Sequence, residues 1–577
     1  MTLSTTVSTS VSQGAITKIT RLFNGTLLDV LHEILQNGRR GAASRISIST
    51  LTEGGRSLLC VADDGTGIDD PAHLITLGQS GWDDDVARRE DPAGMGMFSL
   101  AGRYVEIRSW SPRHATGWQM EIGADDWESS APIPVGPCDI ASGTEICFEL
   151  CPAWEKALSY SVAAAVRHYP LPVTLDGQAI ERTDWLAEAE HIETALGCRI
   201  GVFRGRTVSD QIPRINFHGV TVPCRLPTLI ECAREAQWSV GIDIIDAPQL
   251  QLVLPARKEI IENAGLEALR SAAMTAIFKA IAKRDGHCLS HKDWLRAKER
   301  GVELPEARPR LRQWSPMTGE CTRSGTARLI DAEGALVTPC HSPNFAQCLS
   351  RALEANPEFS TPLVEPEPGF AGYAWYDALP KIEDCEFLIV QGGKEHLFDE
   401  TDDRPDLKSG RADSITALLH FATADDTKQT VRLAADLFIS YDSCLDYEIE
   451  DAAIFLTRAC AIDVDDLTDL LEAICFEAHR DSDADSWDTQ HDQFLLDARQ
   501  LAIEQLLDAD EALIIRCGTV VSKHLRWLVP QGRMITIYLG ADPTRIEISD
   551  IPAAETNEHR SRLRTAVRRK GGREGWR

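Results

Sequence analysis

Two short groups of polar residues near the start of the chain have types and spacing suited to chemistry. Glu33 and Asn37 lie four residues apart in a run of helical character, which places both side chains on one face of a helix. Further on, Asp63 directly follows an apolar run and precedes Gly65 and Gly67. A general base, an amide for Mg²⁺ and a carboxylate for a nucleobase are what an ATP site without a Walker loop requires. The sequence therefore predicts ATP binding.

The hydrophobic pattern predicts the elements that position these groups. Leu27–Ala42 carries an apolar stripe at helical spacing, and Thr26 is a suitable N-cap. Strands are expected at 45–51 and 57–62, so that Asp63 lies at the end of the second strand.

Two further glycine motifs come later in the chain. Gly94 and Gly96 precede an apolar segment for which a helix is expected, where free backbone N–H groups favour an anion. Gly143 and Thr144 open another strand. Each motif by itself is weak evidence for an ATP site. All four motifs occur within about 115 residues, and this combination is unlikely to arise by chance.

In this order the motifs resemble the GHKL superfamily of gyrase B, heat-shock-90 chaperones, histidine kinases and MutL, over roughly residues 20–150. The resemblance implies a Bergerat-type α/β sandwich that binds ATP and Mg²⁺. It also implies roles for Glu33 as the base that activates water, Asn37 as the magnesium ligand, Asp63 as the acceptor for the adenine amino group, Gly65 and Gly67 as points of close approach, Gly94 and Gly96 as lid glycines, and Thr144 as support for the adenine end.

The chain departs from its apparent relatives at two positions. Arg40 stands where an acidic residue is common, and Asp91 stands where a third lid glycine is common. Neither change removes a proposed catalytic atom. Because only 32 residues precede Glu33, without an upstream phosphoacceptor helix, hydrolysis is favoured over histidine kinase activity.

A second module is expected at 155–285, with α+β character. Strands are predicted at 199–203, 214–222 and 239–245, and a long helix is predicted to end near Lys283. The segment around Arg257 and Lys258 resembles the transducer domains of MutL, gyrase B and heat-shock-90 proteins. That resemblance implies that Arg257, or else Lys258, reaches the γ-phosphate and stabilises charge in the transition state. The alternative is that both residues merely end a strand.

Composition and charge limit the classes of protein to which this chain can belong. The 577 residues carry a formal net charge of −29, which argues against broad nonspecific binding to nucleic acid. Eight basic residues between Arg560 and Arg577 form a tail, for which solubility is favoured over a nucleic-acid contact. No apolar run reaches the length of a membrane span, and no secretory signal is visible. Sixteen scattered cysteines lead us to expect reduced thiols and a cytoplasmic protein.

The sequence predicts an α+β protein with four regions: a GHKL-type ATP-binding domain at 1–154, a transducer-like α+β domain at 155–285, a linker and mixed region at 286–410, and an acidic helix-rich region with a basic tail at 411–577. Strands are expected in its late segments 514–517 and 534–538. The favoured function is a Mg²⁺-dependent ATPase with a lid that closes, chaperone-like or clamp-like, which forms a homodimer through its ATPase domains and acts on an unknown protein partner or client. The alternatives are a defence or mobile-element ATPase that acts on nucleic acid or a partner protein, and a nucleotide-sensing switch with negligible turnover.

Overall fold

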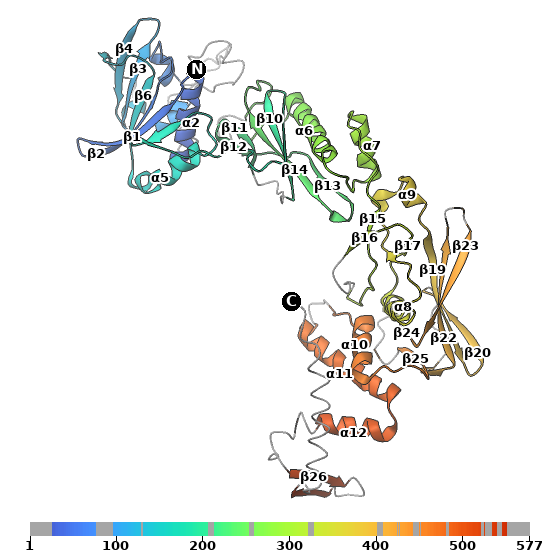
Figure 1. The fold of residues 1–577 in the computed structure, drawn as a ribbon. Coiled ribbons are helices and arrows are strands. Elements are labelled where there is room, and N and C mark those ends of the chain that lie inside the picture. Colours follow the sequence, from blue (N-terminus) through green and yellow to red (C-terminus); the bar gives the residue numbers. More distant parts are fainter. Residues whose placement is uncertain are drawn as a thin grey trace, which may run out of the picture. The chain divides into compact units, whose positions relative to one another are not determined.

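The structure, a computed structural model, describes residues 26–76, 96–128, 131–205, 213–252, 259–320, 328–400, 408–423, 425, 427–441, 449, 452–479, 484–520, 524, 533–538 and 545–550. The chain forms two compact units. Unit 1 contains residues 1–312, 329–333 and 366–378, and unit 2 contains residues 313–328, 334–365 and 379–577. The chain therefore passes between the units five times rather than once. Figure 1 labels the helices and strands and colours them by their order in the sequence.

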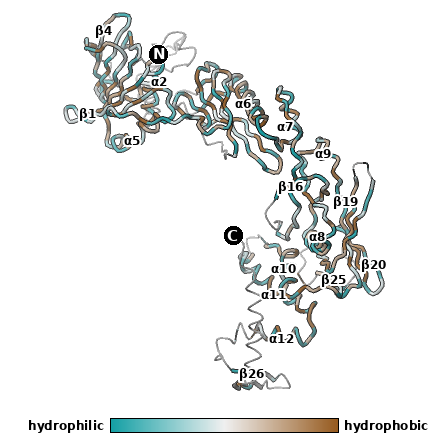
Figure 2. Tube along the Cα trace, in the orientation of Figure 1, coloured by the Kyte–Doolittle hydropathy of each residue, from teal (hydrophilic) through white to brown (hydrophobic). Residues whose placement is uncertain are grey.

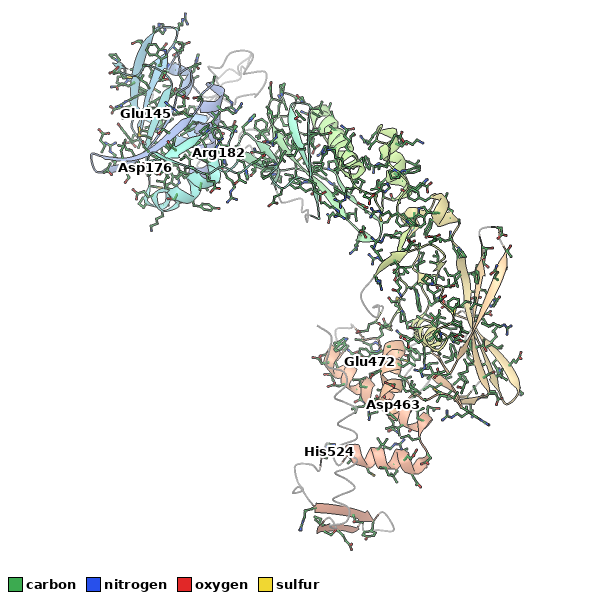
Figure 3. The ribbon with its side chains drawn as sticks, viewed as in Figure 1. Glu145, Asp176, Arg182, Asp463, Glu472 and His524 are labelled. Carbon is green, nitrogen blue, oxygen red and sulfur yellow. A yellow bond between two sulfur atoms is a disulfide. The ribbon has the colours of Figure 1, made fainter. Side chains whose placement is uncertain are left out.

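The first sheet of unit 1 has eight strands in the order β5-β4-β3-β6-β2-β1-β7-β8. They are β1 (Ile46–Glu53), β2 (Arg56–Asp63), β3 (Val105–Ser111), β4 (Thr116–Ile122), β5 (Val135–Cys138), β6 (Thr144–Glu149), β7 (Val173–Leu175) and β8 (Gln178–Ala179). The pairing is antiparallel except between β1 and β7. The turn after β7 is fixed to β1 because the backbone N–H of Thr50 donates to Asp176 Oδ1 at 2.7 Å (Figure 3).

Helices cover this sheet and close its core. They are α2 (Leu27–Arg40), the short α3 (Ala72–Ile75), the 3₁₀ turns η1 (Gly96–Leu100) and η2 (Asp126–Glu128), and α5 (Pro152–Val166). Thr26 caps α2 as predicted, and Asp29 completes a capping box with it. The apolar stripe of α2, with Leu31 fully buried, packs with Ile48 and Leu59 of the sheet. The opposite side of the helix remains available for polar groups.

The second sheet of unit 1 is also mixed. It has the order β12-β11-β14-β10-β9, and β13 pairs with β14. The strands are β9 (His191–Ala195), β10 (Cys198–Arg204), β11 (Pro213–Phe217), β12 (Val220–Pro223), β13 (Thr228–Ile230) and β14 (Gln237–Ile244). The 3₁₀ turn η3 (Cys232–Arg234) comes after β13, and the long helix α6 (Ala264–Ala282) packs on this sheet around the fully buried Trp238.

Unit 1 is completed by segments that come late in the sequence. The helix α7 (His291–Glu299) precedes β15 (Arg310–Arg312), which pairs with β16 (Leu329–Asp331). The turns η4 (Pro368–Phe370) and α9 (Ala374–Asp377) flank Tyr373. This tyrosine is 1% exposed, donates a hydrogen bond to the Leu289 carbonyl at 3.2 Å and lies against His291 and Trp294.

Unit 2 is built on two further sheets. The larger has the order β18-β17-β19-β22-β23, with β20 beside β19, and the smaller has the order β21-β25-β24. Their strands are β17 (Leu336–Val337), β18 (Leu363–Val364), β19 (Lys381–Gln391), β20 (Lys394–Phe398), β21 (Gly410–Ala412), β22 (Ser414–Ala422), β23 (Lys428–Ala435), β24 (Leu437–Ser440) and β25 (Ala453–Thr457). A separate pair is formed by β26 (Arg533–Tyr538) and β27 (Arg545–Asp550). Hydrophobic residues occur along the strands of unit 2 and on the helices that pack against them (Figure 2).

The helices of unit 2 are α8 (Pro343–Ala355), α10 (Val464–Cys475), α11 (Trp487–Leu506) and α12 (Ala509–Val520). Asp463, labelled in Figure 3, caps α10 by accepting from the Asp466 N–H at 2.8 Å. The core of this unit gathers around Phe387, Phe438 and Phe455.

The α+β class is confirmed, whereas several local expectations need correction. The segment 214–222 is a hairpin rather than one strand, and 514–517 lies in α12 rather than in a strand. The region from 411 is helix-rich only from Val464 on, because β22 to β25 precede it. Cys60 and Cys147 form a disulfide, against the expectation of reduced thiols, because β2 and β6 place them opposite each other with Cα atoms 4.0 Å apart. The four-region division stays a prediction.

Across the described ranges, no helix has the length and apolar character needed to cross a membrane.

Candidate active site

The side chains of Glu33 and Asn37 converge on the backbone of Gly96. A Cβ atom placed on Gly96 would lie 2.9 Å from Glu33 Oε2 and 3.7 Å from Asn37 Nδ2. Gly96 opens η1, the short 3₁₀ turn that replaces the expected helix. Any side chain at this position would meet the two polar groups. The structure thus brings three of the sequence-predicted site residues together.

The amide of Asn37 has a partner that the sequence analysis did not assign. Its Oδ1 atom accepts a hydrogen bond from Arg40 NH1 at 3.2 Å, one turn further along α2. The same oxygen is the atom that suits a metal ion. Arg40 therefore holds a cationic group where GHKL proteins commonly have an acidic one.

Asp63 ends β2 beside the same helix. A Cβ on Gly38, the residue after Asn37, would lie 3.4 Å from the Asp63 Cβ atom. The Asp63 carboxylate accepts from the Gly65 N–H at 2.9 Å, and burial raises its pKa above the usual range. The hydrogen bond from Gly65 thus fixes the direction in which the Asp63 carboxylate points.

Thr144 lies directly opposite Asp63. The two residues are register partners in β6 and β2, and Thr144 is 7% exposed. Its hydroxyl is bonded to the hydroxyl of the fully buried Ser109 at 2.8 Å. Ser109 was not predicted, since a serine in an alternating strand gives no signal for a role at a site.

The glycines of the Asp63 loop are required by the protein's own backbone. A Cβ on Gly65 would lie 2.4 Å from the Gly41 carbonyl oxygen, and one on Gly67 would lie 2.1 Å from the Trp110 carbonyl oxygen. Gly67 also has a φ of +81°, which favours glycine. The two glycines thus let the loop between β2 and α3 lie flat against the end of α2 and the end of β3.

Asp64 anchors the same loop from its other side. Its carboxylate accepts from the Ser44 N–H at 2.7 Å, the Ser44 hydroxyl at 2.6 Å and the Arg45 N–H at 3.1 Å. The side-chain bond to Ser44 is the main cause of the lowered pKa of Asp64. The anchoring holds the loop in the position from which Asp63 projects.

Three predicted site residues cannot be placed. Gly94, Arg257 and Lys258 lie outside the described residues, as does the predicted lid at 82–93. Their roles stay predictions.

No protein-family model matches the chain, and no curated protein matches it. Among solved structures, the ATPase region of Saccharomyces cerevisiae topoisomerase II is similar, with a TM-score of 0.30 and 11% sequence identity. That match covers 41% of this chain and 77% of the other. A TM-score this low supports no conclusion about the present chain. The proposal below therefore depends on the residues of the chain itself.

Proposed function

We propose that the chain binds ATP with Mg²⁺ and hydrolyses it at the site formed by α2, the Asp63 loop and Gly96. The observation that supports this most is the convergence of Glu33 and Asn37 on Gly96, while Asp63 lies beside Gly38 on the same helix. Gly38 comes five positions after Glu33, which is roughly 7.5 Å along the helix axis. The base and the amide oxygen thus lie on one stretch of α2, and the partly buried Asp63 carboxylate lies at the end of β2 beside that stretch.

The residues fit the proposed ligands. Mg²⁺ bound with a nucleotide takes few protein ligands and shares the phosphate oxygens. The amide oxygen of Asn37 suits the role of a single protein ligand to Mg²⁺. In the described part of the chain, no cluster of three or more His, Cys, Asp or Glu side chains could hold a metal. Bound Mg²⁺ would neutralise charge on the phosphates. The Asp63 carboxylate, fixed by Gly65, suits the exocyclic amino group of adenine.

Glu33 is the residue to which we assign the chemistry. Its carboxylate would accept a proton from the attacking water, while the N–H groups around Gly96 contact the phosphates. Arg257 or Lys258 would add positive charge from the second sheet's domain. Since hydrolysis of this kind depends on positioning and electrostatics, the order of the segment before Gly96 should control the rate.

Glu33→Gln tests this assignment. Nucleotide binding should persist, because the adenine and phosphate contacts remain, while turnover should fall by roughly 10²–10⁴-fold. Calorimetry with a non-hydrolysable ATP analogue and a phosphate-release assay give the two quantities. Glu155→Gln on the exposed side of α5 is the matched control and should behave as wild type. Wild-type turnover in Glu33→Gln would reject the assignment.

Asp63→Asn tests the other end of the site. A carboxylate that only accepts becomes a group that both donates and accepts, so affinity for ATP should fall by about tenfold or more. The exposed Asp139→Asn in the same domain serves as the control. Affinity for ATP equal to that of wild type would remove the adenine contact from Asp63.

Three functions are compatible with ATP binding at this site: a chaperone-like or clamp-like machine, a defence or mobile-element ATPase, and a nucleotide-sensing switch. A homodimer formed through the ATPase domains, a protein client and a nucleic-acid contact through the basic tail are each proposals. Measured turnover separates a hydrolytic machine from a nucleotide-sensing switch. DNA binding whose affinity falls steeply with salt would favour the defence or mobile-element alternative over the chaperone-like one.

A further inference from the structure

A buried amide on α2 is bonded to the second sheet of unit 1. Gln36 is 1% exposed, and its Nε2 atom donates to the carbonyl oxygens of Phe217 at 2.9 Å and His218 at 3.1 Å. These carbonyls belong to the β11–β12 hairpin. Because Gln36 lies between Glu33 and Asn37 in the sequence, the hairpin holds the helix at the turn that carries the proposed chemistry.

Tyr169 makes a second link at the adjacent residue of α2. Its hydroxyl donates to the Leu35 carbonyl at 2.6 Å, and the side chain is 3% exposed. The hairpin turn lies directly on this tyrosine, since a Cβ on Gly219 would lie 3.2 Å from the Tyr169 Cα and Cβ atoms. Leu35 is therefore held by Tyr169, on which the hairpin turn packs, and Gln36 is held by the hairpin itself.

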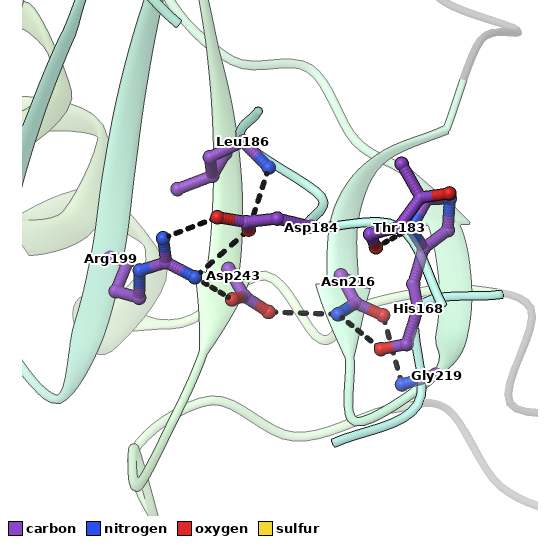
Figure 4. Close-up of polar contacts among 8 residues, drawn as sticks. All are labelled: His168, Thr183, Asp184, Leu186, Arg199, Asn216, Gly219 and Asp243. Atoms are coloured by element: carbon purple, nitrogen blue, oxygen red, sulfur yellow. Dashed lines mark hydrogen bonds and ion pairs between the residues drawn. The ribbon is translucent and has the colours of Figure 1, made fainter. Parts of the chain in front are cut away.

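A chain of polar contacts continues from the hairpin into the sheet (Figure 4). The Asn216 side chain donates to Asp243 Oδ1 at 2.8 Å and to the His168 carbonyl at 3.1 Å, and it accepts from the Gly219 N–H at 2.9 Å. Asp243, on β14, also accepts from Arg199 of β10 at 3.0 Å. One asparagine thus fixes the hairpin turn, the residue before Tyr169 and the central strands to one another.

The segment that carries Tyr169 is also fixed from its other side. Arg182, labelled in Figure 3, donates to the Pro170 carbonyl at 2.6 Å. Arg199 binds both carboxylate oxygens of Asp184, at 3.0 and 2.9 Å. The stretch from α5 to β9 is therefore fixed at several points and can transmit a displacement.

We infer that Gln36 and Tyr169 are positioning residues that make the placement of Glu33 and Asn37 depend on the β11–β12 hairpin. This inference rests on the proposed hydrolysis. A helix moves as a rigid element, and the buried donors and acceptors at this contact have to stay paired. If the second sheet shifts, it either carries α2 with it or breaks these bonds. Reacting groups misplaced by about 1 Å can lower a rate by up to about 10²-fold.

This contact differs from the one proposed for Arg257 and Lys258. Those residues would respond to the γ-phosphate and so act only when ATP is present. The bonds of Gln36 and Tyr169 join protein atoms to protein atoms and need no phosphate. The hairpin can therefore act on α2 whether or not nucleotide is bound.

Kinetics of Gln36→Leu and Tyr169→Phe test the inference. Each removes hydrogen bonds while keeping most of the side-chain volume. We expect kcat to fall by about tenfold in Gln36→Leu, with KM for ATP within about twofold of wild type. Tyr169→Phe should show the same split with a smaller change. The control is Gln347→Leu, because Gln347 is a buried glutamine of unit 2 that donates to the Met317 carbonyl at 2.9 Å.

Hydrogen exchange supplies a readout that does not need turnover. In both variants the amides of residues 213–223 should exchange faster than in wild type without nucleotide. Since coupling is reciprocal, a non-hydrolysable ATP analogue should slow this exchange in wild type but not in Gln36→Leu. Tyr169→Phe keeps the test available if Gln36→Leu does not fold.

The outcomes separate the inference from the function on which it rests. Absence of turnover in the wild type would reject the proposed hydrolysis. An active wild type with unchanged kcat in both variants would reject the inference alone, even if exchange at the hairpin increased, because the contact would then be merely structural. Unchanged exchange would reject it as well.

Discussion

Arg40 occupies the amide oxygen that the proposed metal would need. Its guanidinium donates to Asn37 Oδ1 at 3.2 Å, so a cation and Mg²⁺ compete for one acceptor. Arg40→Gln should lower the Mg²⁺ concentration for half-maximal activity by about threefold, in line with the loss of one partly exposed hydrogen bond from a charged donor. Arg45→Gln, at an exposed arginine beside Asp64, is the control. A Mg²⁺ requirement that is unchanged in Arg40→Gln would show that Asn37 does not hold the metal.

His32, which precedes Glu33, makes the stability of unit 1 depend on pH. Burial lowers its pKa from 6.5 to about 4, against an opposing effect of Asp29, and its Nε2 atom has no hydrogen-bond partner within the described residues. The folded state therefore binds fewer protons than the unfolded state between these values. The stabilisation is complete above pH 6.5 and is lost as the pH falls towards 4.

This prediction is measured by urea unfolding at several pH values. The free energy of unfolding should fall by up to about 1.4 kcal/mol per pH unit between pH 6.5 and 4 through this histidine. His32→Gln should remove that part of the slope, whereas the exposed His114→Gln should keep it. Equal slopes in the three proteins would show that His32 does not carry the effect.

At the scale of elements, the turn into β6 depends on Gly143. This residue has a φ of +73°, and a Cβ on it would lie 1.9 Å from the Asp63 carbonyl oxygen. Gly177 has a similar φ of +79° but no atom within 4 Å of its Cβ position. A side chain at Gly177 would meet backbone strain alone, whereas a side chain at Gly143 would meet both strain and crowding by neighbouring atoms.

Gly143→Ala should therefore lower the free energy of unfolding by about 3 kcal/mol, through strain and displacement of β2 together. Gly177→Ala should lower it by about 1 kcal/mol, through φ alone. Chemical denaturation gives both values. Because β2 carries Asp63, only Gly143→Ala should also weaken ATP binding. If the two variants lose equal stability, the turn at Gly143 can relax without moving Asp63.

Local patterns predicted the helix and strands around the candidate site. The apolar spacing from Leu27 gave α2, the Thr26 cap gave its start, and the apolar run before Asp63 gave β2. These signals succeed because each element buries one regular face.

Other elements depend on contacts that no local pattern records. His218 lies at the turn of the hairpin with a φ of +52°. A histidine in the sequence does not by itself predict this left-handed conformation. The four apolar or charged residues at 514–517 are too few to separate a helix from a strand. Ser109 and Gln36 gain their partners only when distant strands meet them, so their roles were invisible in the sequence.

At the scale of the whole molecule, unit 1 needs residues that come after the first part of unit 2. Tyr373 packs on α7, and the Glu367 carboxylate accepts from the Ala233 N–H at 3.0 Å. A fragment of residues 1–312 should therefore show faster hydrogen exchange in α7 and around η3 than the full chain. A fragment of residues 1–378 should restore most of the protection. If 1–312 is protected like the full chain, the late segments do not stabilise unit 1.

The five passages of the chain between the units also bear on how the protein is made. A ribosome releases the N-terminal part first, yet Tyr373 and its neighbours emerge after the unit 2 segments 313–328 and 334–365. At typical rates of synthesis, the delay between residue 312 and residue 378 is roughly 3–13 s. During that interval the surface of α7 that Tyr373 later covers is exposed to solvent. The nascent chain thus has a defined window in which a chaperone can bind this surface, and the window closes when residue 378 leaves the exit tunnel.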